Sequence, residues 1–320
     1  MAKQHIKPSY AKMDPAHLFD GLFVPVSGKA RPKLCVHPKK HGAFQIGFYG
    51  YDQLGAFDQS LMLAVAAQLG IDGLIVNPDP ETELGQQLRL QMYPKEKDVK
   101  DCRREYRARR TTLRSLLLDA GYKDPDSGAA MTECKTSLNR LGNAQINEVN
   151  PFTGWNQRCN LISTSWNNLS GELHIAANPR MSGAIFRGQH VKISLFERNA
   201  LTSDVAKILH AWLCSNVRLG QKLGNGNGAM LDTLLPHVWG PDHDKKTSAK
   251  VMSVRRGRLR DALDEIRDAT RALDGGYGWE IDRSSSGLVW VSRPKDLPVQ
   301  EAKFGLTPSD LDMGPRRRPL

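Results

Sequence analysis

The chain has 320 residues, of which 40% are hydrophobic and 25% charged, and this composition is typical of a folded protein with room for two domains. No stretch approaches the roughly 20 apolar residues of a membrane span, and no apolar signal segment follows the N-terminus. The five cysteines form no Cys-x-x-Cys pair, so we expect free thiols in a reducing cytoplasm. The formal charge of +11 indicates a polyanionic partner, either nucleic acid or an anionic membrane.

The first 44 residues hold several prolines and lysines without a sustained period, which predicts an extended basic arm. In residues 45–170, apolar periodicity and end signals predict helices at 58–69, 103–120 and 127–141. Short apolar runs between turn residues predict strands at 74–76, 88–92, 144–149 and 158–164.

Residues 171–295 begin with two predicted strands, at 172–176 and 190–195. Thr202 and Ser203 are expected to cap a helix that runs to residue 217. A flexible Gly/Asn segment at 224–228 precedes a short helix at 230–238 and a long helix at 248–273. Two strands, at 278–282 and 288–292, are expected to form a hairpin, and residues 296–320 a basic tail.

Each half therefore contains three helices followed by a β-hairpin. This order is typical of a winged helix-turn-helix, in which the third helix enters the major groove and the hairpin contacts the DNA backbone. We predict an α+β fold with tandem winged helix-turn-helix domains, an N-terminal one at 45–170 and a C-terminal DNA-binding one at 171–295. The repeat is one of architecture, because the halves share no residue-level identity.

The most informative stretch, residues 245–260, carries seven cations and no acid: Lys245, Lys246, Lys250, Arg255, Arg256, Arg258 and Arg260. At about 100° per residue from Lys250, one apolar stripe spans about 140–220° and holds Met252, Leu259, Leu263, Ile266 and Leu273. A second arc, at about 240–340°, holds Ser253, Arg256, Gly257 and Arg260. The helix is thus expected to bury one face and to present a basic face of long donors and small residues.

A helix about 10–12 Å across fits a major groove about 12 Å wide. We expect the groove face to consist of Lys250, Ser253, Arg256, Gly257 and Arg260, where Gly257 permits close approach. Flanking phosphate contacts are expected from Arg255 and Arg258, from Lys245 and Lys246 before the helix, and from Arg283 in the hairpin. The competing interpretation is an ordinary solvated face, which is disfavoured because unneutralised cations repel one another.

The N-terminal half carries weaker signals. Lys135 and Arg140, on the helix predicted at 127–141, are candidate DNA contacts, although this half could instead serve protein contacts such as a homodimer. The basic run at 103–114 is equally compatible with phosphate contacts and with a solvated helix start. A solvated arm is favoured over a zinc site at Cys35, His37 and His41. Core positions, more than base-stacking ones, are expected for Trp166, Trp212, Trp239, Trp279 and Trp290. No metal, cofactor or catalytic motif is predicted, so we do not expect an enzyme.

Several segments in the same order resemble the iteron-binding RepC-type replication initiators of IncQ broad-host-range plasmids. The similarity covers most of the chain and includes Asp14-Pro-Ala-His17, Gly21-Leu-Phe23, Gln87-Leu-Arg-Leu90, Asp126-Ser-Gly128, Gly188-Gln-His-Val191, Leu209-His210, Leu213-Cys214, Asp232-Thr-Leu234, Val238-Trp239, the basic segment 255–260 and Arg293-Pro294. The chain departs from the family pattern in its longer arm, its Gly/Asn loop and its extended tail.

The resemblance implies a bacterial, cytoplasmic protein that binds tandem direct repeats in double-stranded origin DNA and helps to open adjacent AT-rich DNA. It also implies loading of a plasmid-encoded replicative helicase, with a plasmid primase acting later, and no membrane partner. A winged-helix transcriptional repressor is the alternative, and the two differ in target arrangement: direct repeats favour initiation and a promoter palindrome favours repression. A nicking enzyme is a third class, for which we expect no DNA cleavage.

Overall fold

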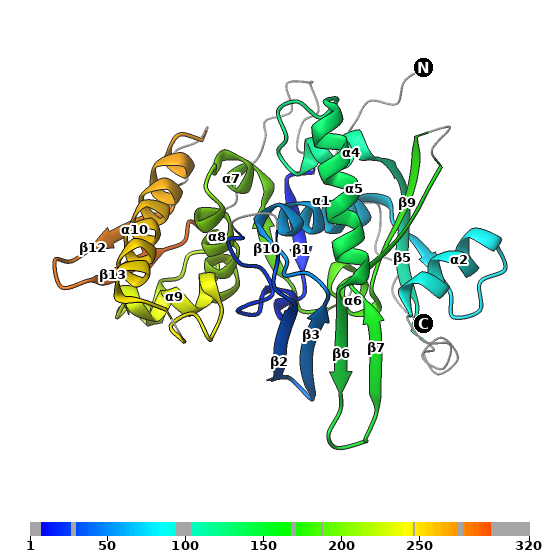
Figure 1. Cartoon of the computed structure of the whole chain (residues 1–320), viewed down its shortest axis with the longest axis horizontal. Helices are drawn as coiled ribbons and strands as arrows, with labels where there is room; N and C mark the ends of the chain where they lie inside the picture. The colour runs from blue at the N-terminus through cyan, green and yellow to red at the C-terminus, as the bar shows by residue number, and fades with distance from the viewer. Residues whose placement is uncertain are drawn as a thin grey trace, which may run out of the picture.

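A computed structural model describes residues 8–26, 30–93, 104–167, 171–186, 188–245, 247–273 and 278–295 (Figure 1). These residues form a mixed α+β structure in which helices pack against several antiparallel sheets. The predicted basic tail at 296–320 and the candidate residue Lys246 lie outside the described residues. No helix in the described ranges is both long and apolar enough to span a lipid bilayer.

The central helix, α1 (Ala56–Asp72), is buried along most of its length. It is apolar on nearly every side, as expected for a helix enclosed by its neighbours. Asp58 lies in its first turn, where the carboxylate accepts a hydrogen bond from the Gly55 backbone N–H at 2.7 Å. Elements from both halves of the chain pack against this helix (Figure 1): β1 (Tyr10–Met13), α4 (Leu113–Asp119), α5 (Gly128–Asn143), α6 (Pro179–Phe186) and α8 (Asp204–Asn216).

The described residues form two four-stranded antiparallel sheets, of which the second contacts α1 through β5 and β9. The first has the order β2 (Leu34–His41), β3 (Phe44–Gly50), β6 (Gln145–Val149), β7 (Asn156–Asn160). The second has the order β4 (Leu74–Val76), β5 (Tyr106–Thr112), β9 (Glu172–Ala177), β8 (Ile162–Trp166). A peripheral helix, α2 (Glu83–Met92), packs beside β8.

The C-terminal part forms a separate group of elements at one end of the molecule (Figure 1). After β10 (Val191–Ser194) and α7 (Leu195–Ala200), the chain forms α8, a short strand, two further helices and a hairpin. The strands make a three-stranded antiparallel sheet of order β11-β13-β12. The elements that follow α8 are β11 (Ala229–Met230), α9 (Leu231–Trp239), α10 (Ala249–Arg271), β12 (Glu280–Arg283) and β13 (Leu288–Ser292).

Helices with a clear cap are confirmed almost to the residue. The hydroxyls of Ser127, Ser203 and Ser248 accept backbone hydrogen bonds at the starts of α5, α8 and α10, as the sequence predicted for all three helices. The strand at 74–76 and the C-terminal hairpin are also confirmed. Local end signals therefore located these elements well.

Two predicted elements are of the wrong type, and the single strand predicted at 158–164 is divided between β7 and β8, which belong to different sheets. Residues 88–92 are not a strand but the end of α2, in which the buried Gly85, Leu88 and Met92 recur at helical spacing after the Thr82 cap. The helix predicted at 103–120 is strand β5 followed by α4. In β5, the buried Tyr106 and Ala108 alternate with more exposed residues, which is the period of a strand.

The predicted arm and domain boundary are corrected as well. The described residues before 44 are part of the fold, because β1 pairs with β10, β2 pairs with β3, and Met13 and Leu22 are fully buried. The boundary expected at 170/171 divides a sheet, since β9 pairs with both β5 and β8. Short extended segments gave no local sign that distant strands would pair with them.

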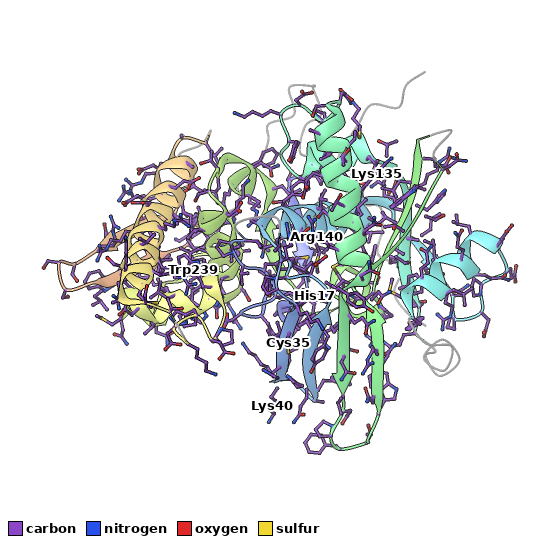
Figure 2. All side chains as sticks on the ribbon, in the orientation of Figure 1. His17, Cys35, Lys40, Lys135, Arg140 and Trp239 are labelled. Atoms are coloured by element: carbon purple, nitrogen blue, oxygen red, sulfur yellow. The ribbon has the colours of Figure 1, made fainter. Side chains whose placement is uncertain are left out.

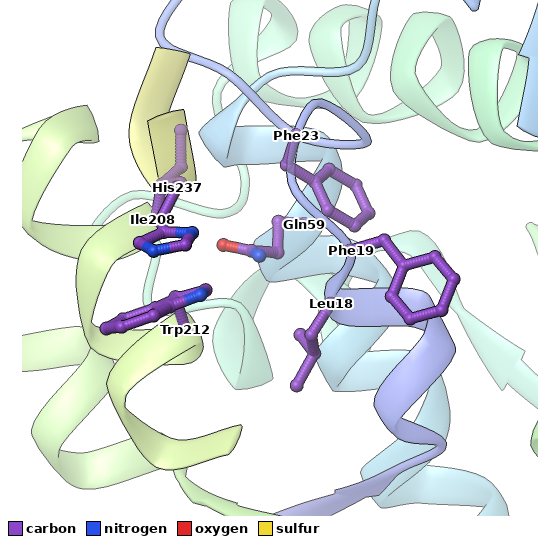
Figure 3. A pocket seen from close by; sticks show the side chains of 7 residues that line it. All are labelled: Leu18, Phe19, Phe23, Gln59, Ile208, Trp212 and His237. Atoms are coloured by element: carbon purple, nitrogen blue, oxygen red, sulfur yellow. The ribbon is translucent and has the colours of Figure 1, made fainter. Parts of the chain in front are cut away.

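The two halves join through η1 (Pro15–Leu18), α8 and α9. Trp212 stacks on His237 with ring centroids 3.9 Å apart, and His237 Nδ1 lies 2.9 Å from the Asp20 carboxylate. A cavity of about 10 Å³, room for one water, separates them from α1 (Figure 3). It is lined by Leu18, Phe19, Phe23, Gln59, Ile208, Trp212 and His237. The halves are therefore in close contact.

Candidate nucleic-acid interface

The predicted buried stripe of α10 is confirmed except at Leu273, which lies beyond the end of the helix and is half-buried. Leu259, Leu263 and Ile266 are fully buried, and Met252 packs partly buried against the same core. The stripe holds α10 against α8 and α9. The opposite side of the first half of the helix faces solvent, and Lys250, Ser253, Arg258 and Arg260 are exposed there. The segregation that the sequence predicted is therefore present in the folded chain.

Gly257 lies at an open position on this helix. A Cβ atom built on Gly257 would meet no other described atom within 4 Å, so internal packing does not require glycine here. Glycine inside a helix costs about 1 kcal/mol relative to alanine. The missing side chain leaves a flat surface on the exposed side of α10, where a partner can approach the backbone closely.

Arg256 is already held by an acidic partner. Its Nε and a terminal nitrogen donate to the two carboxylate oxygens of Asp232, in the first turn of α9, at 2.7 and 2.9 Å. This hydrogen bonding lowers the pKa of Asp232 and raises that of Arg256. The pair is exposed to solvent, so it fixes the direction of the guanidinium more than it stabilises the fold.

Arg255 does not take the position expected of a phosphate contact. Its guanidinium lies over the ring of Trp239, 5.6 Å from the centroid, and donates to the backbone oxygen of His243. Burial lowers the pKa of Arg255. It therefore ties α10 to the loop that follows α9. In that loop, exposed Lys245 pairs with Asp242 at 2.7 Å.

The hairpin β12–β13 is tied to the second half of α10. Arg283, the predicted cation of the hairpin, donates to Asp264 at 2.6 Å, and only 28% of its side chain is exposed. Glu265 accepts from the Ser203 backbone N–H at 3.0 Å and so caps the start of α8. These links hold helix and hairpin in a fixed relation. The turn between the strands exposes Ser285 and Ser286 instead of cations.

On α5, the two predicted DNA contacts differ (Figure 2). Lys135 is exposed, whereas the Arg140 side chain is only 8% exposed and pairs with both Asp58 and Glu133 at 2.8 Å. Arg140 therefore links α5 to α1, and its assignment as a DNA contact is corrected. The described part of the basic run, residues 104–114, also makes contacts within the protein. Arg109 donates to the backbone oxygen of Gln68, in the last turns of α1, at 2.6 Å. Other members form ion pairs: Arg104 with Glu148, Arg110 with Glu172 and Arg114 with Asp126.

Sequence reasoning missed two exposed apolar side chains on α10. Val251 and Val254 are 43% and 48% exposed and lie beside the basic face. The helical angles place them at about 100° and 40° from Lys250, outside the buried stripe, so the signal was present in the sequence. Valine methyls of this kind complement the C5-methyl of thymine in a major groove.

Among the described residues, the ligand atoms of Glu197, His210 and Cys214 come within 4.8 Å of one another, whereas Cys35, His37 and His41 do not gather in this way. His210 Nε2 lies 2.8 Å from a Glu197 oxygen that also accepts from the Trp279 indole at 3.3 Å. All three metal-type ligands are buried. This arrangement fits an imidazolium–carboxylate pair that joins α7, α8 and the start of the hairpin.

The His210 pair predicts a stability loss at alkaline pH. Although burial opposes the charge, Cys214 and Glu197 raise the pKa of His210 from 6.5 to about 9. Because the folded state raises the pKa of His210, the charged pair contributes its full stability below pH 6.5, and this contribution is lost as the pH rises through about 9. Urea unfolding of the wild type should show this decline, and Glu197→Gln should flatten it. Parallel curves for both proteins would contradict the charged pair.

The fold and the site define a mixed α+β protein that presents an exposed basic helix beside a β-hairpin. The family model of replication protein C (RepC) matches residues 5–295, so the chain belongs to this family and is a RepC-type replication protein. A search of curated proteins gave no match. Family membership supports a role in the initiation of plasmid replication and confirms the coarse part of the resemblance.

Proposed function

We propose that this protein initiates plasmid replication by binding tandem direct repeats (iterons) at the origin. The observation that carries the proposal is the exposed basic side of α10, backed by a buried apolar stripe, in a chain of the RepC family. Lys250, Ser253 and Arg260 would face base edges across the major groove, and Gly257 would allow the helix close to them. Arg258 would contact phosphate.

The C-terminal part would act as a winged helix. The order α8, β11, α9, α10 and the hairpin β12–β13, with the sheet order β11-β13-β12, supports this reading. In the N-terminal half, α1, α4, α5 and the hairpin β6–β7 follow a similar order, which supports a second, modified winged helix. Its hairpin belongs to the sheet with β2 and β3. With Arg140 occupied, this half would add contacts through Lys135 or form a dimer surface.

The Asp232–Arg256 pair would help to select the correct DNA. A guanidinium that is already oriented loses less freedom when it meets a guanine edge or phosphate. The Asp232 carboxylate would repel the DNA phosphates at sequences where Arg256 finds no hydrogen-bond partner. Val251 and Val254 would contact thymine methyls along the same groove. The site would therefore combine donors for guanine with apolar contacts for thymine.

The later steps follow from the resemblance. Binding at the repeats would promote opening of adjacent AT-rich DNA in the bacterial cytoplasm, followed by loading of the plasmid-encoded helicase and the action of the plasmid primase. The protein itself would work without a cofactor, metal or enzymatic activity, and without a membrane partner.

Footprinting on supercoiled origin DNA tests the proposal. We expect protection of direct repeats and permanganate sensitivity of neighbouring thymines only when the protein is present. If about six cations reach phosphates, log K should fall with log[salt] with a slope of roughly −5. Protection of a promoter palindrome without strand opening would instead support a repressor, and cleavage with a divalent metal would support a nicking enzyme.

A further inference from the structure

A cavity of about 430 Å³ lies between α2, the C-terminal half of α5 and strand β8. Its size is in the range of small-ligand sites, but its wall is unusually polar. Side-chain amides and hydroxyls dominate it, among them Gln87, Gln91, Asn139, Asn143, Thr164 and Ser165, and among the described residues no charged one lines it. The absence of charge at the wall disfavours a phosphate, carboxylate or metal ion inside the cavity.

Two polar atoms beside this wall lack hydrogen-bond partners among the described residues, and neither is open to solvent. The hydroxyl of Ser163, a residue only 2% exposed, is buried without a hydrogen bond, and so is the side-chain oxygen of Asn160. Buried polar atoms are normally satisfied, because an unsatisfied one destabilises the fold. The side-chain nitrogen of Asn160 donates to the backbone oxygen of Gln91 at 2.7 Å, and this bond holds α2 against the strand. The wall therefore has a fixed geometry, and the accessible amides and hydroxyls of the other lining residues are the groups that a ligand would meet.

Strand β8 adds backbone groups to the same wall. Among the strands of the described residues, it is an edge strand that pairs with β9 alone. Asn178 N–H donates to the Leu161 backbone oxygen, and Asn167 N–H donates to the Glu172 backbone oxygen. In an antiparallel pair every second residue is hydrogen-bonded to the partner strand, so the peptide groups of Leu161, Ser163, Ser165 and Asn167 face β9. The peptide groups of Ile162, Thr164 and Trp166 therefore point away from β9. They add donors and acceptors at the edge that α2 and α5 flank.

Helix α5 connects this cavity with the outer surface. Lys135, Asn139 and Asn143 are exposed and recur every four residues, so they form one stripe along the helix. The two asparagines line the cavity. Lys135 lies one turn before Asn139 on the same helix (Figure 2). The cavity thus offers neutral donor and acceptor groups, an aromatic side chain in Trp166, and one cation outside.

We propose that this cavity binds an unpaired nucleobase of single-stranded DNA. Side-chain amides recognise the donor–acceptor edges of bases, and aromatic rings stack on bases, whereas the phosphate would remain outside near Lys135. In a duplex, these edges are paired and stacked, so the cavity admits only a base that has left the helix. The inference rests on the proposed function, because strand opening at the origin would supply such bases. A peptide strand that pairs with the edge of β8 is the competing occupant.

The test uses a bulky substitution at a lining residue to fill the cavity. A Cβ atom added to Gly142 would meet only the Ile162 oxygen, at 3.9 Å, so Gly142→Trp can place its ring in the cavity without backbone strain. Gly128→Trp, at the open start of the same helix, is the matched control. A double variant, Asn139→Ala with Asn143→Ala, removes exposed amides without adding bulk. Fluorescence anisotropy would measure full-length protein on labelled 20-mers of oligo(dA), oligo(dT) and abasic DNA, and on duplex origin DNA.

We expect the wild type to bind at least one of the two base-bearing single strands about 10-fold more tightly than abasic DNA. Gly142→Trp and the double variant should remove this preference and leave duplex affinity unchanged within about twofold, whereas Gly128→Trp should behave as wild type. Equal affinity for base-bearing and abasic strands overturns the proposal. So does a preference that persists in both cavity variants while their thermal melting remains like wild type. Loss of wild-type duplex binding would contradict the proposed function separately.

Discussion

Replacing Arg260 by alanine is expected to weaken binding of origin repeats by about 1–3 kcal/mol, the contribution of one bidentate contact to guanine. Arg260 is exposed on the predicted groove face, and no carboxylate in the described part of the chain forms an ion pair with it. Its neighbour Arg256 is hydrogen-bonded to Asp232, so replacing Arg256 would also break an ion pair within the protein. Arg260 is therefore the clearer test of base reading.

Arg271→Ala provides the charge-matched control for this prediction. Arg271 is an exposed arginine at the other end of α10, about 16 Å farther along the helix axis. Titrations of both variants on the repeat and on a scrambled duplex would separate reading from general attraction. We expect Arg260→Ala to lower repeat affinity more than scrambled affinity. Equal losses in the two variants, or an equal loss on both duplexes, would show that Arg260 contributes only charge.

The C-terminal site was predictable from sequence because its signals are local. A serine cap and two angularly separated stripes lie within one helix, so residues 248–266 contain the information that orients Lys250 and Arg260. Tertiary contacts decided the rest. Arg255 appeared to be one more cation of the stretch, but its position beside Trp239 depends on a loop whose path the sequence does not reveal.

The N-terminal half was less predictable because its determinants are distant in sequence. Within this arginine run only Tyr106 and Ala108 show the strand period, and β5 is established by pairing with β9, about 60–70 residues later in the chain. Arg140 looked like a surface cation because its partner Asp58 is far away in the sequence. The cavity beside α5 needs three elements from separate regions, so no single segment could indicate it.

Asp58→Ala is expected to reduce the free energy of unfolding by about 3–5 kcal/mol, since it removes one partner of a buried ion pair. The Asp58 side chain is fully buried and accepts hydrogen bonds from Arg31 at 2.8 Å, Arg140 at 2.9 Å and Gly55 at 2.7 Å. Ser137 also donates to it. Without the carboxylate, Arg140 would remain nearly buried between α1 and α5 with only Glu133 to neutralise it.

Urea unfolding of Asp58→Ala and Asp126→Ala would test this prediction. Asp126 forms a single exposed ion pair with Arg114, so its loss should cost at most about 1 kcal/mol. Similar losses in the two variants would contradict a structural role for the Asp58 cluster. A much larger loss of unfolding free energy in Asp58→Ala than in Asp126→Ala would show that Arg140, through Asp58, fixes α5 on α1. That attachment sets the direction of Lys135 and Asn139, because both project from the side of α5 that Arg140 leaves free.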